Sequence, residues 1–131
     1  MACSVGLTHT VSLGELQPIE FNKVLTNIGN GYNANHGHFI TPVKGVYILS
    51  TTVTNMEGQH ISLEIVKNGV QLAALLADGD DYNMGSQTIM VALDKDDVIW
   101  VRHFFSTVAK TMWSRTGEIY NTFSGALLFE Y

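Results

Sequence analysis

The chain has a single cysteine, Cys3, only two prolines, and charged side chains at just 15% of its 131 positions. One cysteine excludes an internal disulfide and a cysteine-rich zinc site. No run of 18 apolar residues occurs, so the sequence predicts no membrane span. It also shows no basic start followed by an apolar run of about 7–15 residues, so no signal peptide is visible in it.

Excess positive charge is missing as well. Seven Lys and Arg against twelve Asp and Glu give a formal net charge of −5, and the broad electrostatic attraction that nucleic acid requires is therefore absent. What the chain does have is apolar material, since 46% of its residues are hydrophobic, too many for a disordered polymer. Its length is typical of one domain, so we expect residues 1–131 to form a single domain that binds no nucleic acid.

Turn-forming residues recur at short intervals, and the stretches between them are typical of β-strands. We predict strands over residues 7–13, 45–54, 61–66, 88–93, 98–105 and 122–129. Asn68-Gly69 predicts a two-residue hairpin, because a type I′ turn needs positive φ at both central positions. Residues 70–77 favour helix by their Leu and Ala content, but eight residues directly after a hairpin turn are better interpreted as a strand. The pattern is that of an all-β sandwich or barrel.

A set of aromatic, Asn and Gly positions gives a more specific signal. Phe21 is followed by Asn27 six residues on, Tyr32 five on, Phe39 seven on, Gly45 six on and Tyr47 two on. Three further segments fit the same pattern in order, residues 66–69, 97–101 and 123–129. With these residues the chain resembles the globular head of complement component one-q over nearly its whole length.

The resemblance implies a ten-stranded jelly-roll β-sandwich of two antiparallel sheets that assembles as a trimer, related in architecture to tumour necrosis factor. It favours core packing over sugar stacking for the aromatic residues of the pattern. The residues expected in the structural core are Phe21, Tyr32, Phe39, Gly45, Tyr47, Trp100, Phe123, Gly125 and Phe129.

The chain departs from the family pattern at Cys3, Leu49, Thr51 and Ala126, and no collagen-like Gly-x-y stretch precedes the domain. It is more similar to free-standing heads that act as soluble lectins or secreted ligands. We expect a secreted homotrimer, most simply an innate-immune lectin that binds microbial carbohydrate or lipopolysaccharide through loops at one end of the sandwich. The alternative is a cytokine-like trimeric ligand that binds a protein receptor along its flanks.

Catalytic motifs are not present. The sequence has no Gly-x-Ser-x-Gly, no phosphate-cradling Gly-rich loop with its Lys, and no His-Glu-x-x-His. We therefore expect neither enzyme activity nor an organic cofactor.

The acidic run Asp78-Gly79-Asp80-Asp81 is the best metal candidate. Ca²⁺ prefers about 6–8 oxygen ligands, and closely spaced carboxylates repel one another unless a cation relieves them. The resemblance implies a calcium site near the trimer axis, held here by Asp80, Asp81 and Gln87 with Asp78 as a further ligand. The alternative is an acidic turn that is simply solvated.

Two imidazoles and the lone thiol remain. His36 and His38 would share a face of a strand, but no third metal ligand is visible, so solvent-exposed loop histidines are favoured over a metal site. Cys3 either pairs between subunits or fills a small buried hydrophobic position.

Trp113 lies in a variable stretch between Lys110 and Arg115. An exposed Trp beside two cations could contact an anionic ligand, and these three residues are the candidate ligand-binding set. The alternative is a structural role for Trp113.

Overall fold

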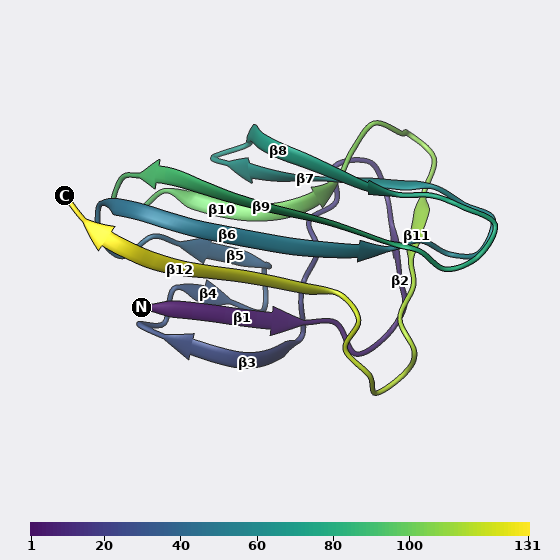
Figure 1. The fold of residues 1–131 in the computed structure, drawn as a ribbon, viewed down its shortest axis with the longest axis horizontal. Helices are drawn as coiled ribbons and strands as arrows, with labels where there is room; N and C mark the ends of the chain where they lie inside the picture. The colour runs from purple at the N-terminus through teal and green to yellow at the C-terminus, as the bar shows by residue number, and fades with distance from the viewer.

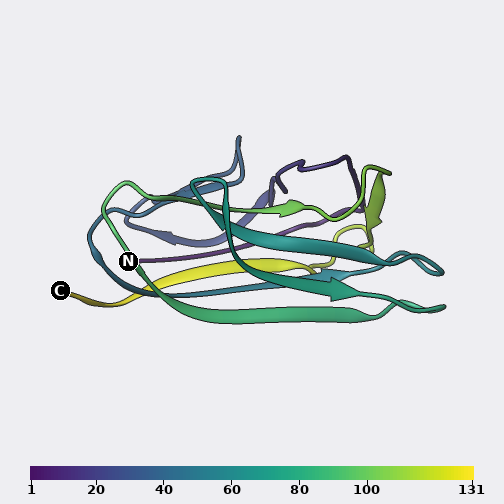
Figure 2. The ribbon, with the colours of Figure 1, turned by 90° about the horizontal axis from the view of Figure 1, so that it is seen from above.

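The computed structural model describes all residues 1–131, which form twelve β-strands and no helix. Ten strands make two five-stranded antiparallel sheets that lie face to face (Figures 1 and 2). The first, called here the β6 sheet, has the order β3 (Lys23–Ile28), β1 (Ala2–Gly6), β12 (Thr122–Glu130), β6 (Gly45–Thr54) and β9 (Met84–Leu93). The second, the β10 sheet, has the order β4 (Tyr32–Asn33), β5 (His38–Ile40), β10 (Val98–His103), β7 (Ile61–Lys67) and β8 (Val70–Ala77). A short pair joins β2 (Val11–Leu13) to β11 (Lys110–Met112).

This architecture confirms the prediction of a jelly-roll sandwich. The structure has no helix that is long and apolar enough to cross a membrane. The hairpin prediction is confirmed too, since β7 and β8 meet at Asn68 (φ 52°) and Gly69 (φ 86°). The segment after that turn is the strand β8, because its backbone groups pair with β7 and this tertiary pairing outweighs its helix propensity.

The predicted strand over residues 7–13 is wrong in its limits. The chain pairs with β12 and β3 up to Gly6 and is in strand again only from Val11. Between these strands the Thr8 amide donates to Oδ1 of Asn22 at 3.1 Å, so a side chain replaces the ladder there. Five further strands were not predicted from the sequence, namely β1, β3, β4, β5 and β11.

The core lies between the two sheets, and the resemblance pattern describes how it is built. Buried and half-buried residues alternate along β6, which directs Tyr47 and Leu49 inward. The Tyr32 hydroxyl donates to the Phe21 carbonyl at 2.8 Å, while the Asn27 side chain bonds both the amide and the carbonyl of Tyr32. The spacing of these three residues therefore reflects one hydrogen-bonded unit.

Glycine is required at Gly45 because a Cβ there would crowd Leu127 and the Phe129 carbonyl. Gly125 lies under Leu49, with Cys3 close by. Most of the expected core residues are confirmed as buried, namely Phe21, Tyr32, Phe39, Gly45, Tyr47, Phe123 and Gly125.

Two expected core residues lie elsewhere. Phe129 is 56% exposed, because a register shift between Leu127 and Phe129 moves it opposite Val46 on the outer face of the β6 sheet. Trp100 is half-buried on the outer face of the β10 sheet, since it alternates with the inward-facing Ile99 and Val101.

Cys3 belongs to the core and is 2% exposed. Burial raises the pKa of its thiol to about 11. The interpretation of Cys3 as a small buried hydrophobic residue is therefore confirmed.

Candidate functional site

The turns that follow β6 and β8 extend side by side at the end of the sandwich opposite to both termini (Figure 1). They are joined by Asn55, which is fully buried. Its Nδ2 lies 3.0 Å from the Met56 and Gln59 carbonyls of its own turn, 3.3 Å from the Gly79 carbonyl and 2.9 Å from the Asp81 carbonyl. Its Oδ1 accepts from the Asn83 amide at 2.7 Å. One buried amide thus ties two loops into a single unit.

A second buried network fixes the chain after β11 to the same end. The Trp113 amide donates to the Thr54 carbonyl at 3.0 Å, and Nδ2 of Asn121 donates to the Trp113 carbonyl at 2.8 Å. The Thr54 hydroxyl in turn donates to Oδ1 of Asn121 at 2.9 Å. Buried polar groups that satisfy one another in this way hold a unique backbone arrangement, so the position of Trp113 is determined by the core.

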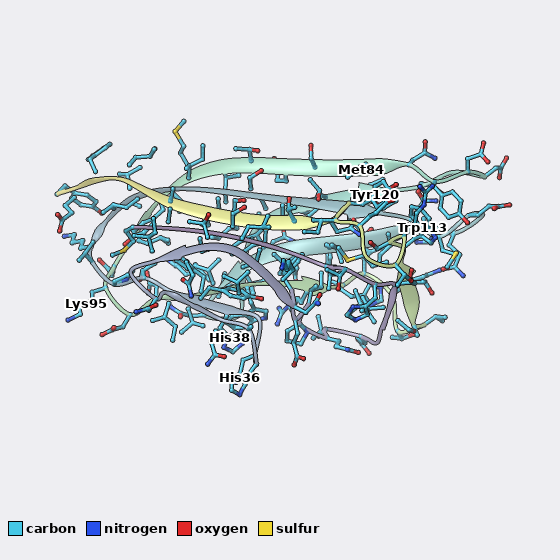
Figure 3. The ribbon with its side chains drawn as sticks, turned by 90° about the horizontal axis from the view of Figure 1, so that it is seen from below. His36, His38, Met84, Lys95, Trp113 and Tyr120 are labelled. Atoms are coloured by element: carbon cyan, nitrogen blue, oxygen red, sulfur yellow. The ribbon has the colours of Figure 1, made fainter.

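These networks bring three aromatic rings together, Tyr82, Trp113 and Tyr120, called here the tip aromatic cluster. The ring centres of Tyr82 and Trp113 are 4.2 Å apart, and those of Trp113 and Tyr120 are 5.3 Å apart. Figure 3 shows Trp113 and Tyr120 together at this end, near Met84. Tyr82 is 44% exposed, so the cluster reaches the surface. Sequence reasoning found only Trp113 of the three.

Charge around the cluster is mostly negative. The Tyr120 hydroxyl donates to Oε2 of Glu118 at 2.9 Å, and this bond raises the pKa of Tyr120. Arg115 approaches the same oxygen at 3.6 Å, with both side chains more than half exposed. Asp81 directly precedes Tyr82 in the chain.

The candidate ligand-binding set is therefore only partly assembled. The only cation–π contact in the structure is Lys44 over Tyr131, so neither Lys110 nor Arg115 stacks on Trp113. Lys110 lies at the start of β11, where it pairs with Leu13. Arg115 reaches the tip aromatic cluster indirectly, through Glu118.

The acidic run lies in the turn between β8 and β9. Asp78, Asp80 and Asp81 are exposed there, whereas Gln87 is inside β9 and donates from Nε2 to the Ala74 carbonyl at 2.9 Å. Within one chain no three His, Cys, Asp or Glu side chains lie together as a metal site. Because three copies around an axis could supply further carboxylates, the calcium site stays a prediction.

No hollow accompanies the tip. Three surface hollows are present, of about 200 to 440 Å³, and none is lined by a member of the tip aromatic cluster or by an Asp of the acidic run at residues 78–81. Small-molecule sites are concave and bury most of their ligand. A tip without such a hollow is instead suited to a large ligand that contacts it from outside.

A second unusual surface is the outer face of the β6 sheet. Two rows of side chains cross all five strands, one of them apolar and the other made of hydroxyl residues. The rows are Ile28-Ala2-Ala126-Ile48-Met90 and Thr26-Ser4-Ser124-Ser50-Thr88. No charged residue belongs to either row, and we call these ten residues the uncharged face.

Two groups of residues in these surfaces escaped sequence reasoning. Tyr82 was not identified, although an aromatic residue between Asp81 and Asn83 in a turn indicates an exposed ring. Asn55 carries no signal that distinguishes it from other turn asparagines, because its role depends on two loops distant in the chain.

Comparison with known proteins agrees with the fold. Residues 2–128 match the family model described as the C1q domain. The chain is 33% identical over 129 residues to complement C1q tumor necrosis factor-related protein 7 of Mus musculus, covering 98% of this chain and 44% of that protein. It is 32% identical over 129 residues to the related protein 1 of Mus musculus, covering 97% and 46%. The chain thus spans less than half the length of these relatives.

Solved structures agree in fold. The globular domain of zebrafish complement 1qA protein superposes with a TM-score of 0.81 at 20% identity, covering 99% of this chain and 98% of that one. The structure of Eiger TNF from S. frugiperda gives 0.77 at 13% identity, covering 100% and 94%. At such identities the likeness shows the fold alone. The match over residues 2–128, and a relative that is 33% identical over 98% of this chain, show that the chain belongs to the C1q domain family.

Proposed function

We propose that this chain is a non-enzymatic recognition protein that acts outside the cell as a homotrimer and binds carbohydrate through the tip aromatic cluster. The observation that carries the proposal is the cluster of tilted rings of Tyr82, Trp113 and Tyr120, held at the surface by buried polar networks. A rigid aromatic surface contributes apolar contact area at a low cost in conformational entropy. Its relatives named as complement and tumour necrosis factor-related proteins support an extracellular role.

The charges at the tip favour a neutral glycan. Arg115 is engaged with Glu118, and three aspartates lie in the adjoining turn, so phosphate groups such as those of lipopolysaccharide would meet like charge. Carboxylates and Asn side chains are acceptors and donors that suit sugar hydroxyl groups. We therefore place neutral microbial polysaccharide before lipopolysaccharide as the ligand class.

The uncharged face supports the homotrimer. Met90 and Ile28 are 71% and 63% exposed in one chain, and they end an apolar row with no charge in it. A sheet face in contact with water usually carries polar and charged side chains, whereas an interface core is depleted of charge. A further copy of the chain is the occupant that we propose, and Phe129 beside Val46 extends the same surface.

We propose in addition that the acidic turn at the tip binds calcium in the trimer. Three copies of the Asp78–Asp81 turn near one axis would collect many carboxylates, and a divalent cation would relieve their repulsion. Ligand binding that survives a chelator would then depend on the aromatic rings alone.

A glycan array tests the binding role, with and without a chelator. We expect saturable binding to a neutral glycan, and loss of that binding in the Trp113→Ala protein. Phe105→Ala is the matched control, because Phe105 is an exposed aromatic residue in a different loop. An array with no specific binding, or equal binding by the Trp113→Ala protein, would contradict the proposal.

A protein receptor is the second candidate, and the loop after β10 favours it. Phe105 is 83% exposed and has a φ of +71°, a conformation that is uncommon for an aromatic residue, and Val108 in the same loop is 65% exposed. Strained, exposed residues are concentrated at binding sites. Binding to a cell-surface protein that is lost in Phe105→Ala and kept in Trp113→Ala would select this function over the glycan.

Sedimentation tests the assembly. We expect a particle of about three times the chain mass of 14.4 kDa. Ile48→Lys should produce monomers, because it introduces a charge into the apolar row, while Ile40→Lys on the β10 sheet should not. A native chain that stays monomeric at micromolar concentration would contradict the trimer.

A further inference from the structure

The turn between β4 and β5 is held in one conformation by the body of the sandwich. The amides of His36 and Gly37 donate to the Asn33 carbonyl at 3.3 and 2.9 Å, and the Asn35 amide donates to the Asn33 side chain at 2.9 Å. Gly37 has a φ of +71° and is buried against the Ile19 carbonyl, where a Cβ would collide with the backbone. The two residues that flank Gly37 are therefore presented from a fixed backbone.

Those two residues are histidines whose rings lie close together. The ring centres of His36 and His38 are 5.9 Å apart with an interplanar angle of 32°. Figure 3 shows both side chains on the same side of the molecule. Exposed loop histidines were expected, and this is correct for His36 only, since His38 is half-buried with its ring centre 5.0 Å from that of Trp100.

Both rings are free to bind a ligand. Among the histidines only His103 forms a side-chain hydrogen bond, so the ring nitrogens of His36 and His38 have no protein partner. Burial, with a smaller contribution from the neighbouring His36, lowers the pKa of His38. Metal ions bind imidazole through the lone pair of a neutral ring nitrogen.

We propose that His36 and His38 form a surface site for one borderline transition-metal ion, with Cu(II) bound most tightly and Zn(II) and Ni(II) less so. Imidazole is a ligand suited to these ions, and their affinities follow the order in which Cu(II) is highest. With metal–nitrogen bonds of about 2.0–2.1 Å, two imidazoles on one ion have ring centres about 4.5–6 Å apart. The observed separation of 5.9 Å lies inside this range, so the two rings are close enough to bind one ion.

The site has open coordination positions. No third His, Cys, Asp or Glu lies within reach, so water occupies the remaining positions and the ion can be exchanged. The ion would lie on the β10 sheet, away from the uncharged face of the β6 sheet, so the site does not depend on the proposed trimer or on the tip.

Trp100 supplies a built-in reporter. The chain has two tryptophans, so Trp113→Phe leaves Trp100 as the only one, next to His38. Cu(II) quenches indole fluorescence at short range. We expect addition of copper chloride in a non-coordinating buffer to quench Trp100 in a saturable way, with one ion per chain.

Variants decide the outcome. In the Trp113→Phe background, His36→Ala should weaken Cu(II) binding at least tenfold, while the contact between His38 and Trp100 is kept. The double variant His36→Ala with His38→Ala should abolish saturable quenching. The matched control is His9→Ala with His60→Ala, which removes two exposed imidazoles elsewhere and should leave the quenching unchanged.

Three results would overturn the proposal. They are equal saturable quenching after both histidines are removed, loss of quenching in the control protein, and no saturable quenching at all in the parent. Zn(II) titration by calorimetry gives a second readout that does not depend on fluorescence, and it should show the same loss in the double variant.

Discussion

Replacement of Asn55 by Asp is the sharpest test of how the tip is held together. The change keeps the shape of the side chain and the acceptor that binds the Asn83 amide at 2.7 Å. It replaces the donor Nδ2 by an oxygen that would face carbonyls at 2.9 to 3.3 Å. Attraction at these contacts then becomes repulsion between oxygens.

The expected loss of folding free energy follows from the two N–H hydrogen atoms that Asn55 loses in this substitution. An amide nitrogen carries two, so Nδ2 makes two full hydrogen bonds among its four neighbours. Each buried partner left unsatisfied costs about 1–3 kcal/mol, which gives about 2–6 kcal/mol. Burial of the new carboxylate places the result toward the upper end of that range.

Urea unfolding followed by circular dichroism measures this cost, and glycan binding measures its effect on the tip. Asn35→Asp is the matched control, because it makes the same chemical change at an exposed turn position and should change the free energy of unfolding by no more than about 0.5 kcal/mol. An Asn55→Asp protein within about 1 kcal/mol of the native chain, with unchanged binding, would refute the role assigned to Asn55.

Three other outcomes are expected. Phe123→Ala should lower the free energy of unfolding by about 3–5 kcal/mol, because it leaves a cavity in the core. Phe129→Ala in the same strand should lower it by under about 1 kcal/mol where the chain is monomeric, because the two side chains are 1% and 56% exposed. Equal urea midpoints for the two variants would be inconsistent with the register shift. Millimolar Ca²⁺ should raise the midpoint of thermal unfolding, with a stabilisation of about 2.7 kcal/mol when free calcium is a hundredfold above its dissociation constant. A midpoint that a chelator does not change, or a shift that persists in Asp80→Ala with Asp81→Ala, would contradict calcium binding by this turn. The pKa of Cys3 is raised from 9.0 to about 11 in the folded chain, so the unfolded chain loses the thiol proton first as the pH rises. Between pH 9 and 11 the free energy of unfolding of the native protein should therefore fall by about 2–3 kcal/mol relative to that of Cys3→Ala. Parallel curves of stability against pH for the two proteins would contradict this.

Local patterns were enough to predict the main strands and the hairpin. Asn68-Gly69 was identifiable because positive φ at two successive residues leaves few alternatives. The core positions of Tyr32 and Tyr47 followed from the resemblance, and the structure explains them by hydrogen bonds to Phe21 and to Val43. Phe129 was misplaced because a register shift after Leu127 reverses the inside and outside of a strand, and alternation in sequence does not reveal it.

The candidate site divides in the same way. Trp113 and the acidic run were identifiable from the sequence, because an exposed Trp beside cations and a run of closely spaced carboxylates indicate binding sites whatever the fold. Tyr82, Tyr120 and Asn55 became part of the site only because three loops meet at one end of the sandwich. Contacts between loops depend on the pairing of whole sheets, which no short stretch of sequence encodes.

By itself the sequence determined the all-β class and the family, because alternation, turn chemistry and the spacing from Phe21 to Tyr47 are local or strictly ordered properties of the chain. The tertiary structure alone decided which side chains share a surface. It gathered the tip aromatic cluster, aligned the uncharged face across five strands, and placed His38 beside Trp100. The physical reason is that strand register and sheet packing are set by the burial of the whole core, and surface neighbours are fixed only after that burial is complete.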